Sequence, residues 1–235
     1  MQKPVSIKPY VLFHSGPFSQ WHISSFRVDG VTYNCCEQYM MAEKARLFKD
    51  DDMHELILRA TAPRQQKALG RGVRGFKEHT WKSNCLRIVT EGNLHKFRQN
   101  TELREKLMAT GERTIAEAAP KDKIWGIGLH ASDKRAQDMS TWRGTNLLGV
   151  ALMTVRERLR KEKDDSEKKT DKKTDVPSSS PPAEPVSLGP QPEEPKETEA
   201  KRRRAKLRTK SSGRGRKKSD RRPRKSGAAG KGEWM

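Results

Sequence analysis

The residues Asn34–Phe48, with the sequence NCCEQYMMAEKARLF, predict one amphipathic helix around which the rest of the chain is organised. Glu37 and Lys44 are seven residues apart, so an acid and an amine share one face of this helix at a separation of roughly 10 Å. Met40 and Met41 place thioethers between them. A small substrate could lie across that face.

The same residues also have a purely structural interpretation. Asn34 can cap the first turn of the helix, and Glu37, three residues on, can accept a hydrogen bond from the Asn34 backbone N–H in a capping box. The spacing alone favours this capping and packing role over a catalytic one. The catalytic interpretation therefore needs support from elsewhere in the chain.

The chain has 235 residues and a formal net charge of +20, and its composition changes near residue 160. Nearly all the aromatic residues precede that point, whereas most of the prolines and a Lys-, Ser- and Glu-rich sequence follow it. We therefore expect one globular domain over residues 8–161, a disordered acidic and proline-rich linker over 162–200 and a disordered basic tail over 201–235. A domain of this size can bury a sizeable core.

Several classes of protein are disfavoured by the sequence. No apolar run approaches the length of a membrane span, and Met1–Pro4 begins no secretory signal. The three cysteines, Cys35, Cys36 and Cys85, are odd in number and lack CxxC spacing, which favours reduced, partly buried thiols over a disulfide framework or a zinc site. We expect a soluble intracellular protein that needs neither a metal nor a cofactor.

The basic tail has two clusters of Lys and Arg, at residues 201–204 and 216–225, and Asp220 is the single acid between residues 201 and 231. A solvated disordered tail is the simplest interpretation. A block this one-sided in charge favours a nuclear-localisation signal, non-specific contacts with nucleic acid, or both. We expect nuclear localisation if the organism is a eukaryote and a cytoplasmic location otherwise.

Turn and capping signals give the order of the other elements. Asp29-Gly30 between two alternating runs predicts a hairpin over residues 26–33, and the acidic run Asp50–Asp52 predicts a helix cap rather than a metal site. Gly92 leaves open an interruption of the longest helix. The remaining predicted elements are strands over 11–13 and 114–119 and helices over 53–60, 61–70, 76–99, 101–110 and 147–161.

Two glycine-containing segments could approach a ligand. Gly70–Gly75 fits the pattern G-x-G-x-x-G, but it follows a helix, whereas a dinucleotide-binding fingerprint must follow a strand. Its arginines, Arg71 and Arg74, could still hold a phosphate, and a solvated turn is an equal alternative. Gly126, beside Trp125, indicates close backbone approach either to another element or to a ligand.

Ordered blocks of sequence are spread over nearly the whole predicted domain: Phe18–Trp21, Cys36–Met40 with Ala42–Ala45, Gly70-Arg71, Trp81, Ile124–Gly128, Trp142–Gly144 and Asn146–Gly149. On these blocks, residues 13–161 resemble the NADAR/YbiA-like family, named for its link to NAD and ADP-ribose metabolism. One position departs from the family pattern. Some bacterial members carry an Asp directly after the Trp-Gly pair, where this chain has Ile127, so a mechanism that uses that Asp cannot be transferred.

The resemblance implies a compact, mainly helical α+β fold with a small β-hairpin or sheet, and an N-glycosidase activity. Family substrates are ribosylated intermediates of riboflavin biosynthesis in some members and ADP-ribose attached to guanine in others. The resemblance also makes Glu37 and Lys44 candidates for catalysis. Further residues in or beside the matching blocks become candidates for substrate binding: Ser19, Gln20, Arg46, Gly70, Arg71, Trp81, Trp125, Gly126 and Asn146.

The implied chemistry would use both groups of the helical stripe. Cleaving a C1′–N bond develops positive charge on the ribose, which Glu37 could stabilise directly or assist by positioning water. Lys44 offers a second route, in which its amine attacks C1′ as the ring opens and forms a Schiff base, provided that its pKa is lowered. Arg46, Arg71 and Arg74 are candidates for lowering that pKa and for binding phosphate.

The other candidates have two interpretations each. Trp81 or Trp125 could stack on the base or on adenine, although Trp81 also fits the apolar stripe of its own helix. Asn146 could hydrogen-bond the ribose or a phosphate, or could simply cap the last helix.

Three functions compete at this point. The first is hydrolysis of ADP-ribosylated guanine in nucleic acid, or of related ADP-ribosylated compounds, with the basic tail bringing the enzyme to nucleic acid. The second is hydrolysis of riboflavin-pathway intermediates, for which the tail has no obvious use. The third is a non-catalytic module that binds ADP-ribose or nucleic acid, in which Glu37 and Lys44 only pack or cap.

Overall fold

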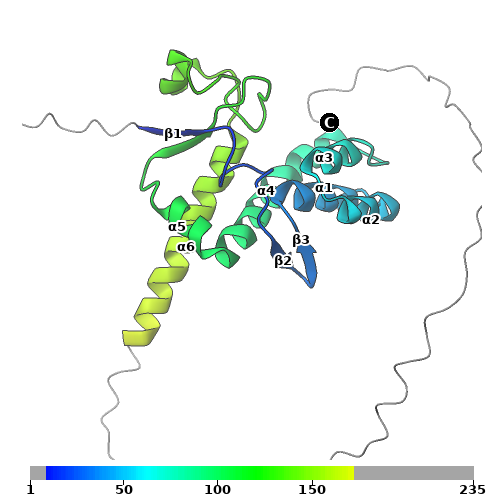
Figure 1. Ribbon diagram of the computed structural model, residues 1–235, viewed down its shortest axis with the longest axis horizontal. Helices are drawn as coiled ribbons and strands as arrows, with labels where there is room; N and C mark the ends of the chain where they lie inside the picture. Colours follow the sequence, from blue (N-terminus) through cyan, green and yellow to red (C-terminus); the bar gives the residue numbers. More distant parts are fainter. Residues whose placement is uncertain (1–8, 172–235) are drawn as a thin grey trace, which may run out of the picture. The chain divides into compact units, whose positions relative to one another are not determined.

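The computed structural model describes residues 9–171 (Figure 1). Of the helices in this range, α1 (Cys36–Leu47) has the largest share of buried residues. Nine of its twelve residues are buried, because α2, α3 and α4 all pack against it. The predicted helix is confirmed, but its predicted amphipathic character is wrong. Neighbouring elements cover nearly all of its faces, so the stripe from Glu37 to Lys44 is buried rather than exposed.

Glycines set the distances between α1 and its neighbours. Helix α2 spans Asp51–Arg59, α3 spans Pro63–Arg71 and α4 spans Glu78–Gln99. A Cβ atom on Gly70 would lie 2.0 Å from the Met41 sulfur, and one on Gly92 would lie 2.5 Å from Cδ1 of Tyr39. Gly92 therefore permits close packing of α4 on α1, and α4 continues through it without interruption.

The strands form two separate pairs. β2 (Phe26–Val28) and β3 (Val31–Tyr33) form the predicted antiparallel hairpin, with positive φ angles of 47° at Asp29 and 82° at Gly30. β1 (Tyr10–Phe13) pairs in parallel with β4 (Thr114–Glu117). Both strands of this second pair were predicted, but their pairing was not, because turn signals identify only neighbours along the chain.

Helix α6 (Leu147–Asp171) packs along α4, and α5 (Thr101–Met108) connects α4 to β4 (Figure 1). The prediction that the last helix ends at Lys161 is wrong. Residues 162–166 and 168 of the added turns are exposed and need no apolar stripe. Arg98 of α4 holds the first added turn through an ion pair with Glu162, Nε to Oε2 3.1 Å. The described range thus has the predicted mainly helical α+β fold.

Parts of the predicted domain organisation lie outside the described residues. They are the first residue of the predicted domain, Lys8, the remainder of the linker from residue 172, and the basic tail over 201–235 with its clusters at 201–204 and 216–225. None of the helices in residues 9–171 is long and apolar enough to cross a membrane. The three cysteines are free and buried.

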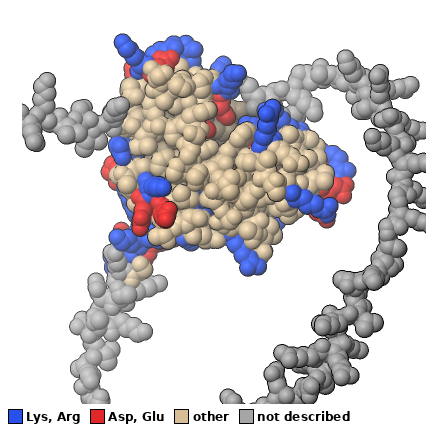
Figure 2. Space-filling view, in the orientation of Figure 1, with Lys and Arg blue, Asp and Glu red and all other residues tan. Residues whose placement is uncertain are grey.

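Charged side chains are unevenly spread over the described surface. On the face shown in Figure 2, Lys and Arg lie mainly around the edge, whereas uncharged residues occupy the middle.

The buried Asp50 caps α2 by accepting a hydrogen bond from the Met53 N–H at 3.4 Å, as predicted for the acidic run. Asp50 also accepts hydrogen bonds from the Arg74 backbone N–H and Nε, at 2.7 and 2.9 Å.

Candidate active site

A cavity of about 860 Å³ lies among α1, α3, the start of α4, the end of β4 and two loops. Seven of the residues singled out in the sequence line it: Ser19, Gln20, Glu37, Lys44, Arg71, Trp81 and Trp125. Four others, Arg46, Gly70, Gly126 and Asn146, do not. The structure thus brings both catalytic candidates and most of the binding candidates to one place.

Glu37 is 2 % exposed and projects from the first turn of α1. Its Oε1 atom has no hydrogen-bond partner among the described residues. Burial raises the pKa of Glu37 to about 7, and Asp122 adds to the rise, whereas Lys67, a hydrogen bond from the Trp21 side chain and Arg71 oppose it. A buried carboxyl group with an unused oxygen in a cavity is available to a ligand.

The capping interpretation of Glu37 is wrong. Gln38, not Glu37, reaches back to Asn34, whose backbone N–H donates to Oε1 of Gln38 at 2.8 Å. The backbone N–H of Glu37 instead donates to the carbonyl oxygen of Gln20 at 3.0 Å. The Glu37 side chain is therefore not engaged in capping α1.

Lys44 is 3 % exposed and lies two turns further along α1. Its Nζ is 4.3 Å from the ring centroid of Phe76 and 5.5 Å from that of Trp81. Burial lowers the pKa of Lys44 to about 8, Arg71 lowers it further and Glu37 opposes the change. A much larger fraction of this amine than of an exposed lysine is therefore unprotonated near neutral pH, as a nucleophile requires.

The other two arginines proposed as neighbours of Lys44 have different partners. Arg46 is exposed on the outer side of α1, with Nη1 3.4 Å from Oε1 of Glu43. Arg74 forms ion pairs with Asp50 and Asp52. Neither lines the cavity. Arg71 is thus the one arginine of the three placed to act on Lys44 or on a ligand.

Gly70 and Gly126 have packing roles behind the cavity. Gly70 abuts Met41, which itself lines the cavity. A Cβ atom on Gly126 would lie 2.9 Å from the Glu117 carbonyl oxygen and 3.0 Å from that of Asp122. The close approach that the sequence indicated at Gly126 is therefore to another part of the chain.

Asn146 directly precedes α6 and has a left-handed φ of 53°. Its side chain does not cap that helix. Nδ2 donates to the Ile115 carbonyl oxygen at 2.9 Å, and Oδ1 accepts from the Glu117 N–H at 3.1 Å. The capping role of the Asn146 side chain is thus wrong, and the side chain instead joins β4 to the start of α6.

The two tryptophan candidates both line the cavity. Trp81 is 2 % exposed and also belongs to the hydrophobic core, so its packing and ligand-facing interpretations are compatible. Trp125 is partly buried, and its backbone N–H donates to Oδ1 of Asp122 at 2.7 Å. Either ring could form an apolar wall for a base.

Five charged residues of the cavity escaped the sequence analysis. They are Lys67, with Nζ 6.0 Å from the Trp21 ring centroid, Glu117, Lys121, Asp122 and Lys123. Glu117 lies within the strand predicted over residues 114–119, and no local pattern indicates that this strand delivers it to a cavity. Lys67 and Arg71 are four residues apart on α3, a spacing that could have suggested a shared basic face.

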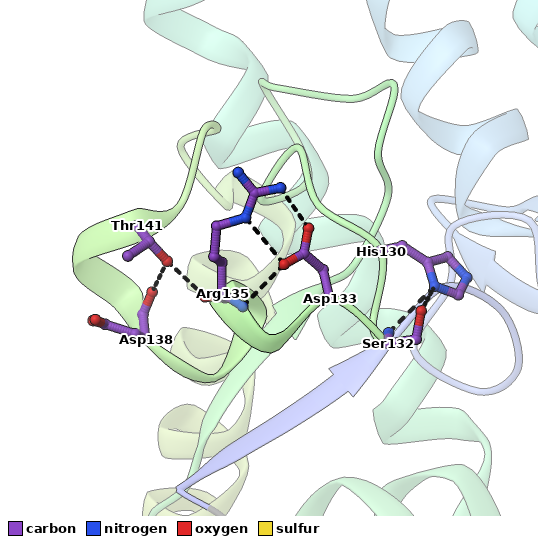
Figure 3. A network of polar contacts seen from close by, with 6 residues as sticks. All are labelled: His130, Ser132, Asp133, Arg135, Asp138 and Thr141. Atoms are coloured by element: carbon purple, nitrogen blue, oxygen red, sulfur yellow. Dashed lines mark hydrogen bonds and ion pairs between the residues drawn. The ribbon is translucent and has the colours of Figure 1, made fainter.

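The segment between β4 and α6 forms one rim of the cavity and contains two short 3-10 helices, η1 (Lys134–Gln137) and η2 (Met139–Thr141). Figure 3 shows its polar network, in which Asp133 accepts from the backbone N–H and Nε of Arg135, both at 3.0 Å. Of the residues labelled there, His130 lines the cavity. Its Nδ1 accepts from the Ser132 N–H at 3.2 Å, which leaves the proton of the neutral ring on Nε2.

The loop that carries Ser19 and Gln20 is anchored by a buried lysine that the sequence analysis did not single out. Lys96 of α4 is fully buried, and its Nζ donates to the carbonyl oxygens of Pro17 at 2.7 Å and Ser19 at 3.2 Å. The side-chain oxygen of Gln20 accepts from Nδ2 of Asn93 at 2.8 Å. One wall of the cavity is thus fixed to α4.

Replacing Lys96 by Met should lower the free energy of unfolding by about 2 to 4 kcal/mol, because two buried carbonyl groups lose their donor. Urea denaturation followed by tryptophan fluorescence would measure the change. Lys106→Met, at an exposed position of α5, is the control and should alter stability by less than about 0.5 kcal/mol. Equal midpoints for Lys96→Met and the wild type would contradict the anchoring role.

No three His, Cys, Asp or Glu side chains within residues 9–171 are grouped so that they could hold a metal ion.

The domain that holds the cavity is similar to known proteins. A family model described as the NADAR domain matches residues 12–160. The chain is 43% identical over 161 residues to N-glycosidase R617 of Acanthamoeba polyphaga mimivirus, a match that covers 63% of this chain and 95% of the viral protein. It is 32% identical over 148 residues to N-glycosidase YbiA of Escherichia coli K12, covering 63% and 84%. The NMR structure of E. coli YbiA superposes with a TM-score of 0.56 at 30% identity, over 68% of this chain and 89% of that one.

Proposed function

The chain belongs to the NADAR domain family, and from this premise we propose that it is an N-glycosidase that hydrolyses the C1′–N bond between ADP-ribose and guanine in nucleic acid or in nucleotides. Relatives from a virus and from bacteria are named N-glycosidases, which makes this protein a hydrolase of the same class. The observation that carries the proposal is the meeting of Glu37 and Lys44 in one cavity. Both are buried, and their pKa values are shifted toward neutrality.

The reaction would use the two groups on the ribose. Glu37, when ionised, stabilises the positive charge that develops at C1′ as the bond to the base breaks. Lys44, when neutral, can attack C1′ as the bond to the base breaks and the base leaves; the ribose on the amine then opens to an imine, and hydrolysis of the imine restores the amine. Both routes consume one water molecule for each base released.

The size and charge of the cavity favour a substrate with a diphosphate. About 860 Å³ lies near the upper end of the range for ligand cavities and suits a nucleoside diphosphate sugar better than a ribosylated pyrimidine monophosphate. Basic side chains outnumber acidic ones around the lining, where Lys44, Lys67, Arg71, Lys121 and Lys123 face Glu37, Glu117 and Asp122. Two phosphates would find cationic partners there.

The basic tail supports nucleic acid as the carrier of the modified base. Residues 201–231 hold one acid among many Lys and Arg, and such a segment contacts phosphates without regard to sequence. The tail lies outside the described residues, so this part of the proposal rests on sequence alone.

Incubating the full chain with three substrates would test the proposal: an oligodeoxynucleotide with ADP-ribosylated guanine, an ADP-ribosylated guanosine monophosphate, and the ribosylaminopyrimidine phosphates of riboflavin biosynthesis. Mass spectrometry should find free ADP-ribose and unmodified guanine from the first two. Turnover of the pyrimidines alone would replace the proposed substrate. Binding of ADP-ribose without turnover of any substrate would indicate a binding module instead.

A further inference from the structure

Glu117, the last residue of β4, is held in place through its backbone on both sides. Its N–H donates to Oδ1 of Asn146 at 3.1 Å, and its carbonyl oxygen accepts from the N–H groups of Ala119 at 3.0 Å and Ile127 at 2.8 Å. In the parallel pair it lies in register with Phe13 of β1. The side chain therefore enters the cavity from a rigid position.

The carboxyl group of Glu117 accepts no hydrogen bond from the described residues. Burial raises the pKa of Glu117 to about 7, with Asp122 and Glu37 adding to the rise and Lys67 opposing it. Near neutral pH a large fraction of the group is protonated. The other titratable side chains that line the cavity are His14, Lys44, Arg71, Lys121, Lys123 and His130.

The neighbouring acid, Asp122, is placed for a different role. Its Oδ1 accepts hydrogen bonds from the backbone N–H groups of Ile124 at 3.0 Å and Trp125 at 2.7 Å. These two hydrogen bonds fix the turn before Trp125. Among the acids of the cavity this leaves Glu37 on α1 and Glu117 on β4 with carboxyl groups that do not fix backbone structure.

We propose that Glu117 is a second catalytic carboxyl group, which donates a proton to the leaving base while Glu37 and Lys44 act on the ribose. The inference rests on the proposed N-glycosidase function and adds the group that activates the leaving base. The two acids lie on different elements of one cavity and have different neighbours. Such an arrangement allows one acid to act as a proton donor while the other acts as an ionised stabiliser.

The step balances without any further reactant. The C1′–N bond breaks, its electron pair goes to the nitrogen of the base, and the proton of the Glu117 carboxyl group moves to the base. Water then adds to C1′, directly or by hydrolysis of the Lys44 imine, and the proton released by water returns to Glu117. One water molecule is consumed and Glu117 is again protonated.

The test compares the wild type, Glu117→Gln, Glu117→Asp and Glu37→Gln, each as the full chain, on two substrates. One is ADP-ribosylated guanosine monophosphate, whose base needs a proton to leave. The other is the 4-nitrophenyl riboside of ADP, whose nitrophenolate leaves without one. Glu117→Gln should slow release of guanosine monophosphate by about 100-fold or more, yet slow nitrophenolate release by no more than about threefold. Glu37→Gln should slow both.

The pH dependence of kcat/KM on the guanine substrate provides a second measurement. The wild type should lose activity at alkaline pH, above the pKa values of both Glu117 and Lys44, because Glu117 loses the proton that it donates. This alkaline loss should vanish in Glu117→Gln, whose residual activity does not use the group, and should return in Glu117→Asp, which keeps a titrating carboxyl group.

Equal slowing of both substrates by Glu117→Gln, or an alkaline loss that persists in that variant, would overturn the role of Glu117 while leaving the N-glycosidase function intact. A wild-type protein that releases neither guanine nor nitrophenolate would overturn the proposed function, and this inference with it. Melting temperatures of all four proteins show whether a loss reflects folding, and Glu117→Asp serves as the folded comparison if Glu117→Gln is unstable.

Discussion

Glu37→Gln should reduce N-glycosidase turnover by about 100- to 1000-fold, the loss expected when one preorganised electrostatic stabiliser is removed. The amide keeps the shape of the side chain but cannot carry the negative charge that the ribose needs. Steady-state release of the free base, followed by chromatography, would measure the effect. Glu43→Gln on the same helix is the matched control, because Glu43 pairs with Arg46 outside the cavity and should leave turnover unchanged.

The same substitution should stabilise the protein at alkaline pH. The folded-state pKa of Glu37, about 7, lies above its ordinary value of 4.5, so the folded state binds the proton more tightly than the unfolded state does. The contribution of Glu37 to stability is full below pH 4.5 and is lost as the pH rises through 7. Gln does not titrate, so Glu37→Gln should be more stable than the wild type by roughly 2 to 3 kcal/mol at pH 8.5 and nearly equal to it at pH 4.5.

Melting curves at the two pH values would show this crossover. If Glu37→Gln is inactive and also less stable than the wild type at pH 8.5, Glu37 contributes to packing. Its buried charge then does not destabilise the folded protein. Unchanged turnover would remove Glu37 from the site altogether.

Lys44→Arg should lose activity by at least about 1000-fold if the lysine forms an imine with the opened ribose, since Arg keeps the charge but cannot supply a neutral amine. Sodium borohydride added during turnover should then reduce the imine and leave a ribosyl adduct on Lys44, detected by peptide mass spectrometry. The internal controls are two other lysines. Lys67 also lines the cavity, and Lys96 is buried with its amine donating to two carbonyl groups. If the imine forms only at Lys44, neither of these lysines carries the adduct.

The pH profile distinguishes this route from one in which Glu37 acts alone. An obligatory neutral amine requires turnover of the nitrophenyl substrate to rise as the pH passes through about 8, where Lys44 loses its proton. A requirement for ionised Glu37 alone gives a rise near 7. Substantial activity in Lys44→Arg, with no adduct, would assign the chemistry to Glu37 and water.

Local signals in the sequence predicted most of the elements but not the spatial relations that make the site. The Asp29-Gly30 turn and the Asp50 cap were both predicted correctly, because each depends on residues a few positions away. The parallel pairing of β1 with β4, and with it the delivery of Glu117 to the cavity, depends on contacts between distant segments. No turn or capping signal reports such a contact.

Candidate site residues were predicted best where the matching blocks and helical spacing agreed. Glu37 and Lys44 satisfy both criteria and line the cavity, whereas Arg46, two residues beyond Lys44, projects from another side of α1. Because α1 is buried nearly all round, its apolar pattern did not reveal which side faces a ligand. Asn146 was found by its motif, but its action through β4 required the structure.

The glycine contacts on either side of α1 make catalysis depend on residues that no substrate touches. Gly70 and Gly92 leave no room for a methyl group against Met41 and Tyr39, which belong to the helix that carries Glu37 and Lys44. A larger residue at either position would displace the Met41 or Tyr39 side chain or α1 itself, and a displacement of about 1 Å is enough to misalign reacting groups. In this domain, whether a substitution preserves activity should therefore depend more on how closely its helix packs on a neighbour than on its distance from the cavity. Variants that fold well can still be inactive.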